Sequence, residues 1–184
     1  MASVLIPIAQ GCEELEAVTL IDLLRRADIE VITAGLTDEP VCCSRGTVII
    51  ADDTLANLED RIFDMIILPG GLPGADYLNA DARIHSFLKK IYANNGYCAA
   101  ICAAPKVLAT AGLLKGRNVT SFPGVLEAFP GDYAELKTDP VVEDGRIITS
   151  RGPGTAMDFA LVLIEKLVGL DIRRQVESGL QRPV

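Results

Sequence analysis

The residue in this sequence best placed for chemistry is Cys102, which ends a short apolar run, Tyr97–Cys102. The length of the run and the turn signal Asn94–Gly96 before it predict a buried strand. Pro105 then opens a second apolar segment that ends near Gly116, a pattern typical of a helix. Cys102 is therefore expected at a strand-to-helix turn, at the sheet edge where open α/β proteins bind ligands.

A thiol at such a turn can act as a nucleophile. The first N–H groups of the following helix carry partial positive charge, which favours the thiolate over the thiol. With a protonated carboxyl nearby, we expect the pKa of Cys102 to fall from the free value of about 8.5 to roughly 5–6. The alternative is a buried and unreactive cysteine, because free cysteines are often simply part of the core.

A nucleophilic thiol also needs an activating group and donors for an oxyanion. Glu16 follows the first predicted strand and flanks an apolar helix stripe, so we expect it to be partly buried. Gly70 and Gly71 follow the predicted strand Asp64–Leu68, at the same sheet edge. The N–H groups of Gly71 and Ala103 are therefore placed to donate jointly to an oxygen bound at the sulfur. The alternatives are an ordinary turn for the glycines and a solvated acid for Glu16.

Other candidates carry weaker signals. The lone histidine, His85, is expected on a helix surface, so no Cys-His dyad is predicted. Arg45 and Arg151 stand at a predicted turn or strand end, where they can serve an anionic ligand or a subunit contact, or simply be solvated. No Cys/His spacing predicts a metal site, and the glycine-rich loop lacks the Lys-Ser/Thr of a phosphate-binding loop. The roles of four further cysteines stay open: Cys12, Cys42, Cys43 and Cys98.

Strands and helices alternate along the chain. The predicted strands are Val4–Ala9, Glu30–Gly35, Asp64–Leu68, Tyr97–Cys102, Val119–Phe122 and two within Val141–Ser150, with a hairpin in Val41–Ile50. The predicted helices are Glu13–Arg26, Asn79–Asn94, one from Pro105 to Gly116, one after Gly154 and one over Leu170–Leu180. Because the early strands are continuous apolar runs, the sequence predicts a mostly parallel sheet covered on both faces. We expect one three-layer α/β domain over residues 1–184.

Composition excludes several classes of partner. The chain has 184 residues and a net charge of −8, which disfavours nucleic acid and anionic membranes because both need basic patches. No apolar run reaches membrane-spanning length, and the polar residues after Ile6-Pro7 argue against a signal peptide. Five cysteines without a pairing pattern favour a reducing cytoplasm.

Five stretches taken together resemble the ThiJ/PfpI superfamily, in particular its branch of the Parkinsonism-associated protein deglycase and bacterial YajL. They are GCEELEA, VCCSRG, ILPGG, AAICAAP and TSRGPGTA, and the resemblance runs from residue 4 to about 168. It implies a flavodoxin-like sandwich and a homodimer, for which the exposed side of the first helix offers Leu15 and Val18. It also implies a nucleophile elbow with Cys102 at positive φ, and a protonated Glu16 hydrogen-bonded to the sulfur.

Two departures from relatives shape the expected chemistry. Ala103 follows Cys102 where protease-like relatives carry histidine, which argues against a peptidase. Phe122 stands where the animal deglycases carry a histidine near the pocket, so Glu16 must handle the protons of any reaction. No cofactor is implied.

The resemblance leaves more than one function open. The first hypothesis is a deglycase or glyoxalase-type enzyme that takes methylglyoxal, glyoxal or their early protein or nucleotide adducts and releases lactate or glycolate. The second is a redox-sensing stress chaperone in which Cys102 is oxidised to sulfinate without turnover. A purely structural or binding module is the third.

Overall fold

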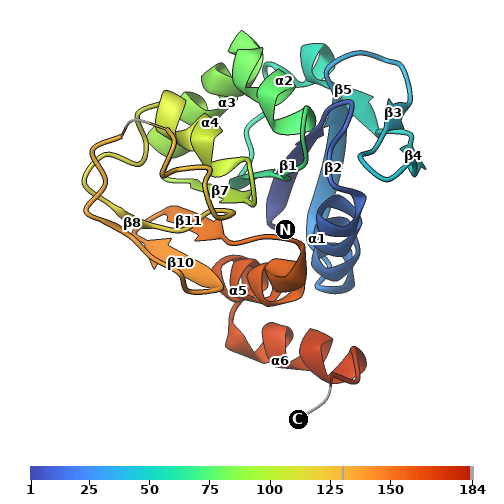
Figure 1. Cartoon of the computed structure of the whole chain (residues 1–184). Helices are drawn as coiled ribbons and strands as arrows, with labels where there is room; N and C mark the ends of the chain where they lie inside the picture. The colour runs from blue at the N-terminus through green and yellow to red at the C-terminus, as the bar shows by residue number, and fades with distance from the viewer. Residues whose placement is uncertain (130, 183–184) are drawn as a thin grey trace.

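The centre of the molecule is a seven-stranded sheet that is parallel except at one edge (Figure 1). This computed structural model describes residues 1–129 and 131–182. In spatial order the strands are β10 (Val141–Asp144), β11 (Ile147–Ser150), β7 (Tyr97–Ile101), β6 (Met65–Leu68), β1 (Ser3–Ile8), β2 (Glu30–Gly35) and β5 (Asp53–Thr54). Only β10 runs antiparallel, against β11. The mostly parallel sheet predicted from the apolar runs is thus confirmed.

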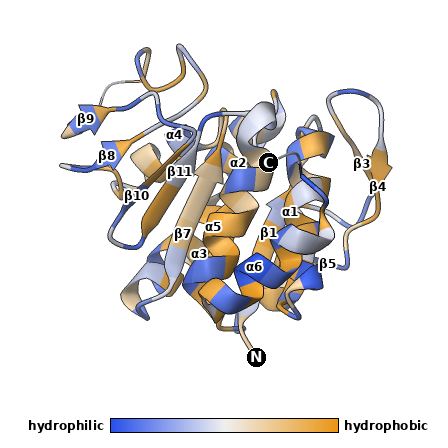
Figure 2. Cartoon of the chain, turned by 90° about the horizontal axis from the view of Figure 1, so that it is seen from below, coloured by the Kyte–Doolittle hydropathy of each residue, from blue (hydrophilic) through white to orange (hydrophobic). Residues whose placement is uncertain are grey.

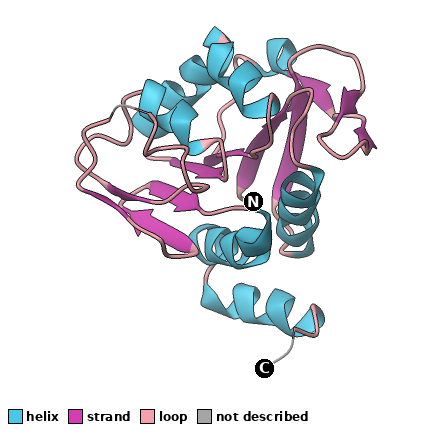
Figure 3. Ribbon diagram, in the orientation of Figure 1, coloured by secondary structure: helices cyan, strands magenta, loops and turns pink. Residues whose placement is uncertain are grey.

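Helices cover both faces of the sheet and complete a three-layer sandwich (Figure 3). One face carries α1 (Glu14–Arg26), α5 (Ala156–Val168) and α6 (Leu170–Gly179). The other carries the 3₁₀ helix η1 (Leu55–Leu58), α2 (Gly74–Ala80), α3 (Ala82–Ala93) and α4 (Pro105–Thr110). Alternate residues of β1 point into the two cores, as Ile6 and Leu5 do, which is why this strand is apolar throughout.

The helices have the periodicity that such a sandwich requires. On α1 the core face holds Leu20 and Leu24, while Arg25 and Arg26 sit in the last turn, where positive charge suits the helix dipole. In Figure 2 α5 is coloured mostly hydrophobic, and α6, which packs on it, is largely hydrophilic. The buried α5 therefore lies between the sheet and α6.

Several predicted boundaries were wrong. The helix expected over residues 79–94 is two helices, because Asp81 is extended and its carboxylate accepts a hydrogen bond from Arg83 N, which caps α3. The preceding α2 was missed because it follows a run of Gly and Pro. The helix from Pro105 ends at Thr110, short of Gly112, which has a positive φ of 75°.

Two small sheets lie outside the central one. The strand predicted over residues 119–122 is the short β8 (Asn118–Val119), which pairs with β9 (Glu135–Leu136) and not with the central sheet. The hairpin predicted in residues 41–50 is confirmed as β3 (Val41–Cys42) and β4 (Val48–Ile49). In the part of the chain that the structure describes, no helix is long and apolar enough to cross a membrane.

Candidate active site

The candidate site forms where three neighbouring strands end. Strands β7, β6 and β1 lie side by side and run parallel, so the residues that follow them meet at one edge of the sheet. Cys102 follows β7, Gly70 follows β6, and Glu16 lies in the first turn of α1 after β1. A side chain built on Gly70 would contact both Cys102 and Glu16, so the three residues are in direct proximity. The structure thus brings together the residues that the sequence pointed to.

Cys102 has the strained backbone that a nucleophile elbow predicts. Its φ is 62°, in the left-handed region that residues with a side chain rarely adopt. Its N–H donates to Ser150 O at 3.0 Å, and its carbonyl accepts from Phe122 N at 2.9 Å. These two hydrogen bonds hold the residue in place from both sides, so the surrounding structure enforces the conformation. Ser150 was not singled out from the sequence, since its contribution is a backbone carbonyl.

Replacing Cys102 with glycine should remove this strain, which is on the order of 1–3 kcal/mol. At an ordinary position a glycine variant is less stable than the alanine variant by roughly 0.5–1 kcal/mol. At residue 102 we expect the reverse order, with Cys102→Gly at least as stable as Cys102→Ala in thermal or urea unfolding. A glycine variant that melts several degrees below the alanine variant would contradict enforced strain.

Glu16 is completely buried, more so than the sequence suggested. Its Oε2 accepts a hydrogen bond from Gly70 N at 2.8 Å, while Oε1 is buried without a hydrogen-bond partner among the described residues. Burial raises the pKa of Glu16 to about 7, against the smaller lowering effects of the Gly70 N–H and the Cys102 thiol. The carboxyl can therefore gain or lose a proton near neutral pH, which suits an acid–base catalyst.

The environment of the sulfur differs from the sequence-based expectation. Burial first, and then the negative charge of Glu16, raise the pKa of Cys102 to about 12, although the N–H groups of Gly71 and Ala103 act in the opposite direction. The predicted lowering of this pKa is therefore wrong in direction, because it counted the N–H groups and not the loss of solvent. The N–H groups of Gly71 and Ala103 lie at the sulfur, and their role as oxyanion donors stays a prediction.

The coupled thiol and carboxyl titrate together. Burial raises the pKa of both groups, and the negative charge of Glu16 raises that of the Cys102 thiol further. As the pH rises, the carboxyl therefore loses its proton before the thiol does. The Glu16 carboxylate is then placed to take the proton of the thiol.

Gly70 packs against both Cys102 and Glu16 and leaves no room for a larger residue. A Cβ at this position would lie 2.6 Å from Cys102 Cβ and 2.8 Å from Glu16 Oε2. Real Cβ atoms do not approach other heavy atoms so closely, so an added methyl group must shift Cys102, Glu16 or the Gly70 backbone from its present position. Glycine is required here for space.

The Gly70→Ala variant should therefore lose activity without losing its fold. Moving the thiol and carboxyl by about 1 Å is expected to lower the turnover of any reaction that uses both groups roughly 10²-fold. The crowding should also destabilise the protein by about 1–3 kcal/mol. Gly179→Ala is the matched control, because nothing lies within 4 Å of the added Cβ. Steady-state rates and urea unfolding measure both effects, and wild-type turnover in Gly70→Ala would show that the pair tolerates displacement.

A shallow hollow lies near the backbone of Cys102, although Cys102 is not among the residues that line it. It has a volume of about 200 Å³ and is lined by Phe122, Pro123, Arg151 and residues 152–155. Phe122 is half exposed, and its backbone N–H donates to Cys102 O, which connects the wall of the hollow to residue 102. The guanidinium group of Arg151 donates a hydrogen bond of 3.4 Å to Ser121 O. The hollow has room for a small carbonyl compound.

Other candidate residues lie elsewhere. Arg45 is exposed at the turn of the β3–β4 hairpin, where its N–H donates to Glu14, and it does not line the hollow. His85 lies on α3, where its Nε2 is 2.8 Å from Asn79 O of α2, so it is not beside the thiol. Among the described residues, no three His, Cys, Asp or Glu side chains are grouped to hold a metal ion.

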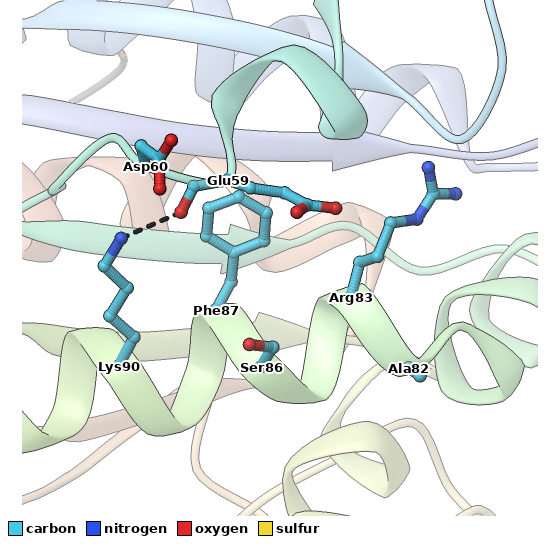
Figure 4. A pocket seen from close by; sticks show the side chains of 7 residues that line it. All are labelled: Glu59, Asp60, Ala82, Arg83, Ser86, Phe87 and Lys90. Carbon is cyan, nitrogen blue, oxygen red and sulfur yellow. Dashed lines mark hydrogen bonds between the residues drawn. The ribbon is translucent and has the colours of Figure 1, made fainter.

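A larger cavity lies away from the thiol. Figure 4 shows this cavity, of about 320 Å³, between α3 and the segment after η1. Lys90 donates to Glu59 O at 2.8 Å, and Arg83 is paired with Asp81. Because none of Cys102, Glu16 and Gly70 lines it, this cavity is a weaker candidate than the hollow near residue 102.

Comparisons with known proteins agree with this geometry. A sequence model described as "DJ-1/PfpI family" matches residues 2–166. The chain is 41% identical to protein dj-1beta of Drosophila melanogaster, over 97% of this chain and 96% of that protein. It is 38% identical to glutathione-independent glyoxalase DJR-1.2 of Caenorhabditis elegans, over 91% and 89%.

Solved structures are similar over the whole chain. The crystal structure of Drosophila DJ-1beta matches with a TM-score of 0.93 and 40% identity, covering 100% of this chain and 99% of that one. Oxidized DJ-1 of Toxoplasma gondii matches with a TM-score of 0.94 and 38% identity, covering 100% of both chains.

Proposed function

Because the chain belongs to the DJ-1/PfpI family, we propose that it is a cysteine-dependent glyoxalase- and deglycase-type enzyme. Its substrates are methylglyoxal, glyoxal and their early adducts with proteins or nucleotides, and its products are lactate or glycolate. The observation that carries the proposal is the thiol of Cys102 beside the buried carboxyl of Glu16, with the N–H groups of Gly71 and Ala103 at the sulfur. The similarity to a protein named as a glyoxalase supports this class of reaction.

In the proposed reaction Glu16 first acts as a base. Its carboxylate takes the thiol proton as Sγ attacks the aldehyde carbon of methylglyoxal, and a hemithioacetal forms. The N–H groups of Gly71 and Ala103 stabilise the negative oxygen while the new S–C bond forms. Glu16 then returns its proton to that oxygen. This sequence needs a carboxyl that changes protonation near neutrality, which is the property that burial gives Glu16.

The second half of the reaction is an internal redox step followed by hydrolysis. Glu16 removes the proton from the former aldehyde carbon and delivers it to the neighbouring ketone carbon, while the hydroxyl proton of the first carbon passes to the ketone oxygen. The first carbon is thereby oxidised to a thioester carbonyl, and the second is reduced to an alcohol. The product is a lactoyl thioester on Cys102. Water then cleaves the S–C bond, releasing lactate and restoring the thiol. Methylglyoxal and water thus become lactate and a proton, with no cofactor.

Lactate formation by the purified protein tests the proposal. We expect lactate from methylglyoxal, and glycolate from glyoxal, without added glutathione. Cys42→Ser is a useful control, because Cys42 is an exposed thiol outside the site. Protein that consumes methylglyoxal without releasing lactate would show adduct formation in place of catalysis and would exclude the proposed reaction.

One observation favours a second function, sensing of oxidants. Cys102 is partly accessible, Glu16 Oε1 has no hydrogen-bond partner among the described residues, and one similar structure is that of an oxidized protein. A protonated Oε1 can donate to a sulfinate oxygen on Cys102. Intact mass after mild peroxide separates the two functions. A gain of two oxygens that is lost in Cys102→Ser, without aldehyde turnover, supports a redox-sensing stress chaperone.

We also propose that the protein is a homodimer. The outer side of α1 exposes Leu15 and Val18, and the β3–β4 hairpin beside it exposes Val48 and Ile50. Glu14 joins these two elements by accepting hydrogen bonds from Arg45 N and Thr47 N. In the proposed dimer these four exposed side chains make up one apolar patch, of the kind that marks a protein contact. A two-fold arrangement would make this patch self-complementary.

The dimer should be visible in solution. Light scattering at micromolar concentration should give about twice the chain mass of 19.6 kDa. Val18→Glu places a charge in the patch and should shift the protein toward the monomer, whereas Glu39→Gln on an exposed loop should not. A wild-type mass near that of one chain would exclude the dimer.

A further inference from the structure

Two cysteines outside the catalytic site form a buried pair. Cys12 Sγ and Cys43 Sγ lie 3.5 Å apart, although the residues are distant in the sequence. Cys12 is completely buried and Cys43 is 5% exposed. Cys12 belongs to the segment between β1 and α1, and Cys43 follows β3 in the hairpin. Neither thiol takes part in the reaction proposed above.

The backbones on both sides of this pair are held together by hydrogen bonds. Gly11 N donates to Cys42 O and Ser44 N donates to Cys12 O, both at 2.8 Å. These bonds and the contact between the two sulfurs hold Cys12 and Cys43 side by side, as a disulfide requires, since its Cα atoms lie about 4.4–6.8 Å apart. We propose that Cys12 and Cys43 form an intramolecular disulfide that ties the β3–β4 hairpin to the segment before α1.

A hydroperoxide is the oxidant that we assign to this modification. One thiol attacks the peroxide, forming a sulfenic acid and releasing water, and Cys43 is the more accessible of the two. The second sulfur then displaces a second water as the S–S bond forms. Two thiols and one H₂O₂ thus become one disulfide and two waters. Because burial raises the pKa of both thiols, the disulfide follows sustained oxidant exposure and is not a rapid sensor.

The hairpin is the part that moves when the bond forms. The sulfurs must approach from 3.5 Å to about 2 Å. Cys12 has little freedom, because Gly71 and Gly74 pack against its backbone so closely that an added Cβ would lie within 2.6–2.7 Å of Cys12 atoms. The hairpin has strands of only two residues each, so it is the more adjustable of the two segments. Closure therefore ties down the hairpin and leaves the Gly70-Gly71 loop in place.

Peptide mapping after oxidation tests the pairing. The reduced full chain carrying Cys102→Ser is exposed to hydrogen peroxide, quenched with an alkylating agent and digested with trypsin. We expect two fewer alkylated thiols and a reducible link between the peptides spanning residues 1–25 and 27–45. The link should persist when Cys42→Ser is added and vanish with Cys12→Ser or Cys43→Ser. A link that requires Cys42, or Cys12 and Cys43 that both remain alkylated, would overturn the proposal.

A stability measurement gives a second, independent readout. The oxidised Cys42→Ser/Cys102→Ser protein should melt on the order of 5 °C higher than its reduced form, because the bond closes a loop of about 30 residues in the unfolded chain. A reducing agent should reverse the shift, and adding Cys12→Ser should abolish it. In a background with Cys102 intact, Cys12→Ser and Cys43→Ser should retain methylglyoxal turnover. An unchanged melting temperature in a protein shown to carry the link would contradict the proposed tie.

Discussion

Cys102→Ser is expected to lower methylglyoxal turnover by at least roughly 10³-fold while leaving the fold intact. The reaction proposed here passes through a bond to sulfur, and a serine hydroxyl is a far weaker nucleophile near neutral pH. The Cys102 thiol has a raised pKa, but in the proposed reaction it passes its proton to the Glu16 carboxylate as it attacks. The replacement keeps the Cβ, the hydrogen bonds to Ser150 and Phe122, and nearly the same volume. Initial rates of lactate release, with thermal unfolding as a check on folding, measure the effect.

The matched control is Cys42→Ser, which makes the same chemical change at an exposed thiol on the hairpin. It should retain turnover close to wild type. A Cys102→Ser enzyme that keeps more than about a tenth of the wild-type rate would mean that the thiol is not the nucleophile, and the proposed reaction would have to be abandoned.

Glu16→Gln is expected to lower turnover by about 10²–10⁴-fold, the usual range for losing a general acid–base catalyst. In the wild type the carboxylate form takes the thiol proton, and burial holds the pKa of this carboxyl at about 7. The wild-type kcat/KM should therefore rise with pH through about 7. Glutamine cannot accept that proton, so the rise should be absent from the variant. A pH–rate profile of each protein provides the comparison, and an unchanged rise in the variant would assign the titration to another group.

Glu16→Gln should also differ from the wild type in how its free energy of unfolding depends on pH. Because the folded state raises the pKa of Glu16 from 4.5 to about 7, the native protein holds this proton more tightly than the unfolded chain does. The stability contributed by the neutral acid is fully present below pH 4.5 and is lost as the pH rises through about 7. Glutamine is neutral throughout, so the stability of Glu16→Gln relative to wild type should increase from pH 4.5 to pH 8, by on the order of 2–3 kcal/mol.

Urea unfolding at several pH values checks this difference. Glu39→Gln is the control, because the same chemical change on an exposed loop meets no burial. Taking the difference between variant and wild type removes the effect of carboxylates such as Asp52, whose lowered pKa destabilises both proteins in acid. A difference that stays constant with pH would show that Glu16 is not buried as a neutral acid.

The sequence predicted the layout of the site because the layout follows from strand order. Glu16, Gly70 and Cys102 each follow an apolar run, and parallel strands must end at one edge of the sheet. The positive φ of Cys102 was also predicted, since a side chain can leave a tight strand-to-helix turn in few ways. These properties depend on local sequence and chain direction, both of which can be read from the sequence.

The properties that could not be predicted from the sequence depend on exclusion of solvent and on contacts with residues far along the chain. The pKa of Cys102 was predicted in the wrong direction because desolvation depends on what covers the sulfur, and α1 and the Gly70 loop come from elsewhere in the chain. The boundaries of short strands were predicted wrongly for a similar reason. Strand β8 is held by β9, an exposed pair of residues without a strand-like pattern of its own. The closeness of Cys12 to Cys43 likewise requires the hairpin to fold back over the start of α1.

The two hydrogen bonds that hold Cys102 in its strained conformation also determine when, during synthesis of the chain, residue 102 can reach that conformation. Both partners, Phe122 and Ser150, lie later in the chain, and Ser150 ends a strand that docks beside β7 only after it has been made. Synthesis proceeds from the N-terminus, so Cys102 leaves the ribosome before either partner exists. Until then its backbone is free to relax, and the thiol is not yet fixed beside the carboxyl. A truncated or newly made chain therefore carries Cys102 as an ordinary solvated thiol, and the arrangement of sulfur, carboxyl and N–H groups is completed only after Ser150 has been made.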